Sequence, residues 1–140
     1  MYNTMTDINL WSVLAAGVSY IILGMIWYSP KGVFGRQWMQ LVKRNESEIR
    51  ASGSGTKAII ICLIPTFVIA YVLAHFVKLV GVTTISGGIQ LGFWLWLGFV
   101  ATFTFNEVVY EQRPMKLYLI NNACNLLALM IMGAILVQWQ

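Results

Sequence analysis

The chain has 140 residues, of which 59% are hydrophobic and only 10% are charged. Nine basic and five acidic side chains cannot give a 15.8 kDa protein the polar surface that a water-soluble domain needs. The composition therefore excludes a soluble domain and predicts a single-domain, all-α integral membrane protein.

The first apolar segment, residues 8–29, contains no charged residue. It is long enough for a helix to cross a hydrocarbon core of about 30 Å. Its hydrophobicity is continuous rather than alternating, which favours a transmembrane helix over a barrel strand. Gly17 and Gly24 are seven residues apart and share one face, so this face is expected to contact a neighbouring helix.

Residues 31–44 have the pattern of an amphipathic helix, with an apolar face that contains Phe34, Leu41 and Val42. Such a helix suits the interface, where basic side chains gain from anionic lipid. Simple anchoring of the first helix is the alternative. The expected lipid-headgroup residues are Arg36, Trp38, Lys43 and Arg44. Residues 45–56 are polar and end in a Ser-Gly tract, which predicts a flexible linker.

Three further transmembrane helices are expected at residues 57–79, 89–110 and 116–138. Pro65 predicts a kink in the first of these. The stretch GVTTISGG at residues 81–88 is interpreted as a loop. Small residues in and just before the third helix predict a close helix contact; they are Gly88, Gly92, Gly98 and Ala101.

The basic residues indicate how the chain crosses the membrane. Six lie between the first two helices and two between the last two, which leaves only Lys78 on the opposite side. The positive-inside rule then places both basic connections in the cytoplasm and both termini outside. Because the basic residues act as topology signals, the chain's net charge of +4 does not indicate nucleic-acid binding.

Polar residues gather where the third helix ends and the fourth begins. Glu107 and Glu111 are one turn apart, and Arg113 follows them. Tyr118, Asn121, Asn122 and Asn125 share one broad face of the fourth helix. A cytoplasmic-side polar cluster is therefore expected. It acts either as hydrogen-bonded contacts between helices or as a substrate or ion site, because ionisable residues within a span are candidate functional groups.

Other reactive side chains do not form a recognisable site. Cys62 and Cys124 stand alone, so neither a metal site nor a redox pair is indicated, and no cofactor is expected. His75, Gln90 and Asp7 are expected near the outer face and close enough to approach one another. The sequence contains no catalytic triad and no glycine-rich phosphate loop, which argues against an enzyme.

Three stretches resemble one known family: GMIWYSPKGVFGRQWM at 24–39, WLGFVATFTFNEVVYEQRP at 96–114 and KLYLINNACNLLALMIMGAIL at 116–136. They are similar to the small bacterial membrane family catalogued as domain of unknown function 1761. The resemblance implies a four-helix protein in the inner membrane of a bacterium, without an established activity. The positions that carry the pattern are Trp27, Tyr28, Ser29, Pro30, Phe34, Gly35, Trp38, Glu111, Arg113, Pro114 and Asn121.

The family pattern shifts the expected shared site toward Glu111, Arg113 and Asn121, with Glu107 as a local addition. This set is expected to tie three helix ends together at one depth. Two functions then compete. The first is a small transporter or channel-like homo-oligomer, and the second is an accessory subunit that scaffolds other membrane subunits or binds lipid. A hydrated cavity lined by Glu107, Asn121, Asn122 and Asn125 favours the first.

Overall fold

The structure is a computed structural model, and it describes residues 7–29, 31–43 and 54–139. Within these ranges it contains helices and no strand. Long helices are α1 (Leu10–Tyr28), α4 (Ser54–Val80) and α7 (Met115–Gln138). A further long helix is built from α5 (Ile85–Leu95), the π-helix η2 (Trp96–Ala101) and α6 (Thr102–Val109), and α2 (Gly35–Leu41) is short. The described residues contain four helices long and apolar enough to cross a membrane, as predicted.

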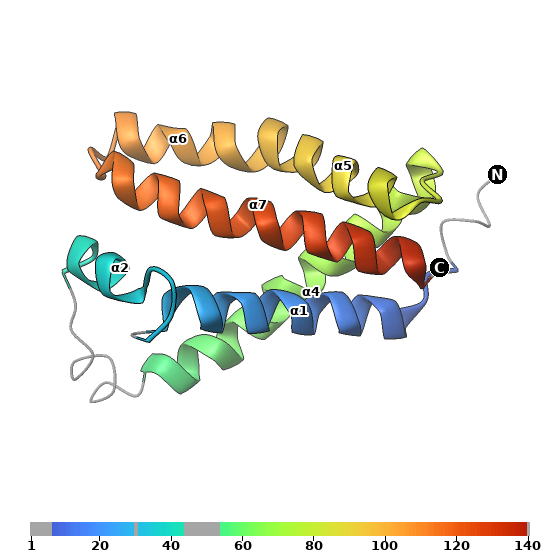
Figure 1. Cartoon of the computed structure of the whole chain (residues 1–140), viewed down its shortest axis with the longest axis horizontal. Helices are drawn as coiled ribbons and strands as arrows, with labels where there is room; N and C mark the ends of the chain where they lie inside the picture. Colours follow the sequence, from blue (N-terminus) through green and yellow to red (C-terminus); the bar gives the residue numbers. More distant parts are fainter. Residues whose placement is uncertain (1–6, 30, 44–53, 140) are drawn as a thin grey trace.

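Helices α1 and α7 and the α5–α6 helix run side by side along one axis, and α4 crosses them obliquely (Figure 1). In this view α7 lies between α1 and the α5–α6 helix. It contacts α1, α4 and α5. One end of the bundle, here called the terminal end, holds the start of α1, the α4–α5 turn and the end of α7. The other end holds the end of α1, α2 and the α6–α7 turn, and it is called the basic end. Its described basic residues include Lys31, Arg36, Lys43, Arg113 and Lys116.

Glycines let α5 and α7 touch along their backbones. A Cβ atom added to Gly88 would overlap the carbonyl group of Gly133, and one added to Gly92 would overlap that of Leu129. Since both helices approach this closely, the predicted contact through Gly88 and Gly92 is confirmed. By contrast, Gly24 and Gly98 have open space beside them within the chain.

We expect Gly92→Ala to lower the free energy of unfolding by about 1–3 kcal/mol, because the new methyl group must push two backbones apart. Gly24→Ala is the matched control. It makes the same change in helix propensity, worth up to about 1 kcal/mol in favour of alanine, without a steric overlap. Unfolding in mixed micelles, followed by circular dichroism, measures both. Equal stability of the two variants would contradict the close α5–α7 contact.

Helix α5 begins at Ile85, so the interpretation of residues 81–88 as a loop is wrong for residues 85–88. Thr84 caps the helix, since its side-chain oxygen accepts a hydrogen bond from the Gly87 amide at 3.0 Å. Gly88 reads as a helix breaker in the sequence, but here it serves the contact with α7. The other observed bounds of the four spanning helices lie within three residues of the expected ones.

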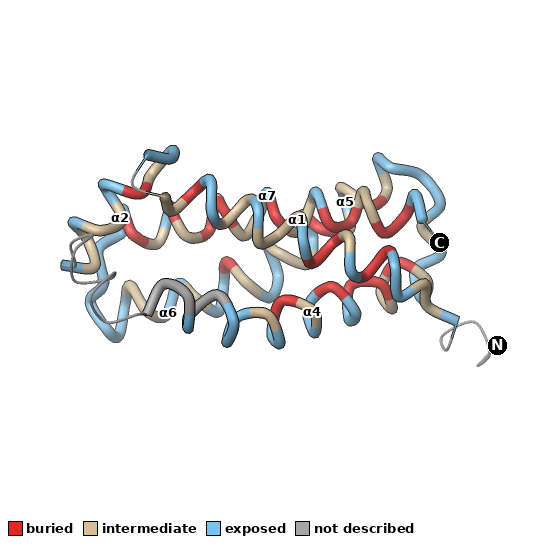
Figure 2. The backbone as a smooth tube through the Cα atoms, turned by 90° about the horizontal axis from the view of Figure 1, so that it is seen from below, coloured by how far each residue is buried: buried red, intermediate tan, exposed pale blue. Residues whose placement is uncertain are grey.

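Helix α4 packs on the main core with its second half. Ala70, Leu73, Ala74 and Val77 are buried there, whereas Ile60, Ile61 and Ile64 in the first half are exposed. In Figure 2 the buried positions of α4 lie mainly toward the terminal end. Pro65, the predicted kink position, lies inside the helix near this change. The basic half of α4 therefore leaves the η2–α6 side of α7 uncovered.

The chain after α1 folds back over the end of that helix. The amides of Ser29, Val33 and Phe34 donate to the last α1 carbonyl groups at 3.1–3.2 Å, which satisfies acceptors that a helix end leaves free. Gly35 starts α2, and a Cβ atom there would overlap the Ser29 carbonyl group. This geometry explains why glycine follows phenylalanine in the stretch WYSPKGVFGRQW at residues 27–38.

Helix α2 covers residues 35–41, which is shorter than the expected 31–44. Its apolar side packs on protein: Phe34 lies 4.9 Å from Trp27 between ring centroids, and Leu41 joins the cluster around Trp27. Anchoring of α1 is thus visible in these contacts. The position of α2 in a lipid headgroup layer stays a prediction. Arg36 and Lys43 are exposed, while Arg44 and most of the expected linker lie outside the described residues.

Candidate functional site

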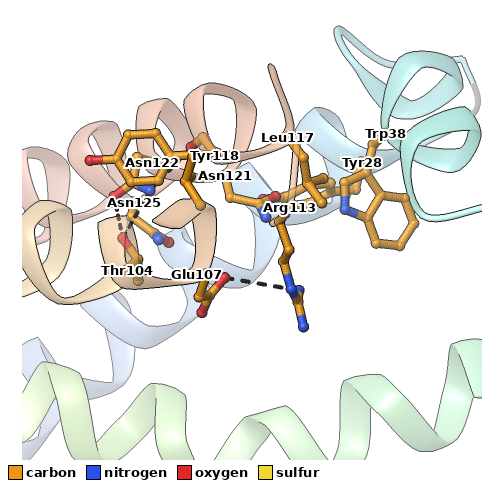
Figure 3. A pocket seen from close by; sticks show the side chains of 11 residues that line it. Tyr28, Trp38, Thr104, Glu107, Arg113, Leu117, Tyr118, Asn121, Asn122 and Asn125 are labelled. Carbon is orange, nitrogen blue, oxygen red and sulfur yellow. Dashed lines mark hydrogen bonds and ion pairs between the residues drawn. The ribbon is translucent and has the colours of Figure 1, made fainter. Parts of the chain in front are cut away.

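A polar cavity of about 380 Å³ opens at the basic end, where α6, α7, α2 and the end of α1 meet (Figure 3). We call it the vestibule. Its walls combine one acidic, one basic, three amide and several aromatic side chains. The lining residues are Tyr28, Trp38, Thr104, Glu107, Val108, Arg113, Leu117, Tyr118, Asn121, Asn122 and Asn125.

Asn122 is a structural contact between helices. Its buried amide group donates to the Thr104 hydroxyl at 3.0 Å and to the Tyr118 carbonyl at 3.1 Å. Thr104 in turn donates to the Val100 carbonyl at 2.7 Å. The Tyr118 hydroxyl donates to the Ala101 carbonyl at 2.8 Å, which adds a second link from α7 to the π-helical segment. These bonds hold η2 and α6 against α7.

Asn121 joins α7 to the end of α1. Its side-chain oxygen accepts a hydrogen bond from the Tyr28 hydroxyl at 2.8 Å. The Tyr28 ring meets the Trp38 ring edge to face, with 5.2 Å between centroids. The ends of α1, α2 and α7 are therefore joined at the vestibule wall. The Asn121 amide nitrogen has no partner among the described residues and remains available to a bound molecule.

Glu107 and Glu111 sit on either side of Arg113. Arg113 Nε donates to Glu111 at 2.9 Å, and its Nη1 lies 3.9 Å from Glu107 (Figure 3 shows the second pair). The Arg113 and Glu107 side chains are 52% and 45% exposed. Glu111 holds the guanidinium group more closely than Glu107 does, so the Glu107 carboxylate keeps free acceptor positions.

Glu111 does not line the vestibule, which differs from the expected site. Helix α6 ends at Val109, and Gln112 has a left-handed φ of 52°. The chain therefore turns before Glu111 completes another helical turn on the Glu107 face. The other five expected substrate or ion residues do line the vestibule: Glu107, Arg113, Asn121, Asn122 and Asn125.

Trp38 and Tyr28 are site residues whose position the hydrophobic pattern did not reveal. Trp38 was expected at lipid headgroups, yet its ring lies on Tyr28 at the vestibule wall. The signal available in the sequence was the aromatic stretch WYSPKGVFGRQW at residues 27–38. This stretch and Asn121 both carry the family pattern. Amphipathicity alone does not say whether an apolar face meets lipid or protein.

Two of the three polar residues expected at the outer face, His75 and Gln90, bond within their own helices. The His75 ring nitrogen lies 2.9 Å from the Tyr71 carbonyl oxygen, and Gln90 lies 3.5 Å from the Ser86 hydroxyl. No hydrogen bond joins His75, Gln90 and Asp7 in the described part of the chain. In that part there is also no group of three or more His, Cys, Asp or Glu residues that could hold a metal ion. Cys62 is exposed and Cys124 is buried, and both are free.

The vestibule does not extend through the bundle. Beyond Asn125 the interior is filled by Met132 and Leu136, which are fully buried. The backbone contact between Gly88 and Gly133 closes the same region from the α5 side. This packed region separates the vestibule from the terminal end in this conformation.

Asn122 and Asn125 offer a test that separates structure from binding. We expect Asn122→Leu to lower the free energy of unfolding by about 1–3 kcal/mol, since it removes the interhelical bond to the Thr104 hydroxyl and the bond to the Tyr118 carbonyl within α7. Asn125→Leu is expected to change stability little, because the Asn125 side chain has no hydrogen-bond partner in the described ranges. Unfolding in mixed micelles compares the two. Equal losses would show that Asn125 is also a structural contact.

The comparisons place the chain in a family and give no functional relative. No curated protein and no solved structure matches the sequence. The family model described as "Protein of unknown function (DUF1761)" matches residues 11–137, which covers all the long helices and nearly the whole chain. The match includes the residues that join α1, α2 and α7 around Asn121. The protein therefore belongs to this membrane-protein family.

Proposed function

We propose that the protein is a small membrane carrier that binds a cationic polar solute in the vestibule. The observation that carries this proposal is the half-exposed Glu107 carboxylate inside a cavity within a membrane-spanning helix. An ionisable group in a span is costly unless it is paired or serves a function. Arg113 is already held by Glu111 at 2.9 Å, which leaves Glu107 a weaker partner at 3.9 Å.

The free amide group of Asn125 supports the same solute class. Asn125 lines the same cavity as Glu107, and an amide oxygen together with a carboxylate can coordinate a cation or accept hydrogen bonds from an ammonium group. By the positive-inside rule the basic end faces the cytoplasm, so the vestibule receives its solute from that side.

A carrier fits this geometry better than a channel because the cavity ends at a packed core. Access from the other side then requires a change of conformation. Ile60, Ile61 and Ile64 in the first half of α4 are exposed, so movement of this half breaks few buried contacts. A homo-oligomer is part of the proposal, because four helices from one chain enclose little space.

The accessory-subunit function has one observation in its favour. Most of the polar cluster forms hydrogen bonds between helices, through Asn122, Tyr118 and the Tyr28–Asn121 pair. A protein that only scaffolds a complex needs such contacts and needs no free carboxylate.

Uptake into proteoliposomes tests the proposal. We would measure entry of protons, sodium, potassium and methylammonium with wild-type protein, Asn125→Leu and protein-free vesicles. We expect wild type to transport at least one cation and Asn125→Leu to transport it at least tenfold more slowly with unchanged stability. Absence of uptake of every cation by folded wild type would overturn the carrier proposal and favour the accessory subunit.

A further inference from the structure

A second cavity lies next to the vestibule, nearer the middle of the spanning helices. It has a volume of about 350 Å³, and every residue that lines it is apolar. The walls come from α4, the α5–η2 helix and α7, and they include Val68, Val72, Phe99, Val100 and Leu129. We call this cavity the apolar groove.

The vestibule and the apolar groove lie one after the other between the α5–α6 helix and α7, and we call this line the seam. Val100 lines the groove and Thr104, four residues later on the same helix, lines the vestibule. On α7 the corresponding pair is Leu129 and Asn125, also four residues apart. Four residues make about one helical turn, so the two cavities occupy successive turns between the same two helices. The seam is therefore polar at the basic end and apolar toward the membrane centre.

The apolar groove is accessible from its side. Val68, Val72 and Phe99 are all exposed although they line it. In a membrane-spanning segment an exposed apolar side chain meets lipid, so a lipid chain can enter without crossing the water phase. The incomplete packing of α4 leaves this opening.

The polar end of the seam carries two opposite charges that keep free hydrogen-bonding positions. The Glu107 carboxylate and the Arg113 guanidinium lie 3.9 Å apart, and only the Nε edge of Arg113 is engaged closely, by Glu111. A carboxylate accepts hydrogen bonds from a primary ammonium group, and the remaining guanidinium N–H groups suit a phosphate. An anionic head without an ammonium group would leave Glu107 facing a like charge.

We propose that the seam holds one zwitterionic phospholipid with a primary ammonium head, drawn from the bilayer. The ammonium group binds Glu107 and the Asn125 amide oxygen, the phosphate binds Arg113, and an acyl chain occupies the apolar groove. This inference rests on the proposed function, because it names the substrate class of the same site. It adds that the solute carries an apolar chain.

Binding to the full chain, measured by native mass spectrometry from detergent, tests this inference. The probes are lauroyl-lysophosphatidylethanolamine, lauroyl-lysophosphatidylglycerol and glycerophosphoethanolamine, which has the head without the chain. A buried methylene contributes about fourfold in affinity. We therefore expect the first probe to bind at least tenfold more tightly than either of the others.

Two variants locate the chain. Val72→Trp fills the groove and should weaken binding of the lysophosphatidylethanolamine probe at least tenfold. Val18→Trp is the matched control, since Val18 and Val72 are 43% and 46% exposed and Val18 lines neither cavity. If Val72→Trp fails to fold, Phe99→Ala, which widens the groove at an exposed position, replaces it and should also weaken binding.

The outcomes separate this inference from the proposed function. Equal binding of the tailless head and the acylated probe would overturn the inference and leave a carrier of small cationic solutes. Equal binding of the ethanolamine and glycerol probes would overturn the assigned head group. If neither these probes nor methylammonium binds to folded wild type, the proposed function fails as well.

Discussion

Glu107→Gln is expected to reduce cation uptake into proteoliposomes at least tenfold while the protein stays folded. Glutamine keeps the size and the acceptor oxygen of the side chain but removes its charge. Loss of a hydrogen bond between a charged group and a bound cation costs roughly 1.5–3 kcal/mol, which corresponds to a loss of at least tenfold. The pair with Arg113 spans 3.9 Å between half-exposed groups, so its removal should cost about 0–1 kcal/mol of stability.

Asp7→Asn is the matched control for Glu107→Gln. It makes the same loss of one negative charge at an exposed position at the terminal end, outside the vestibule. Uptake by this variant should equal that of wild type. Unchanged uptake by Glu107→Gln would remove the carboxylate from the mechanism, and equal losses in both variants would indicate an effect of net charge alone.

Trp27→Ala is expected to lower the free energy of unfolding by about 3–5 kcal/mol. Trp27 is 8% exposed and packs with Phe34 and Ile120 at the basic end. Its indole nitrogen also donates to the Ile120 carbonyl at 3.0 Å, which joins α1 to α7. Removal of the ring leaves a cavity and takes away the surface on which α2 packs.

Trp94→Ala provides the comparison for Trp27→Ala. Trp94 is 64% exposed, so truncation of this ring removes few contacts within the chain. Unfolding in mixed micelles, read by circular dichroism, should give a small change for Trp94→Ala and an intermediate one for Trp27→Phe, which keeps most of the volume but loses the hydrogen bond. Similar losses at Trp27 and Trp94 would show that the α1–α7 contact contributes little.

The spans were predictable because each depends on a local property. A helix that crosses lipid needs about 20 apolar residues, and the charged connections mark where it stops. The start of α5 was not predictable from local sequence. Gly88 and Gly87 read as breakers, but the residue that explains Gly88 is Gly133, far away in the chain. The π-helical turn at Trp96–Ala101 left no recognised signal either.

The candidate site was predictable where helical spacing decided it. Asn121, Asn122 and Asn125 share one face of α7, and the structure puts all three on the vestibule. The error at Glu111 comes from the left-handed turn at Gln112, because a non-glycine residue gives little warning of this backbone conformation. The sequence also does not predict which asparagine forms a structural contact and which stays free, since this depends on the partner that each side chain meets.

The glycine contact between α5 and α7 fixes the register of these two helices. A slide of α5 along α7 by a single residue brings Leu91 or Phe93 to the place where Gly92 now touches Leu129. In the proposed carrier this pair is therefore the fixed part. Since Trp27 and Tyr28 also bind α1 to α7, the helix left free to move in that proposal is α4.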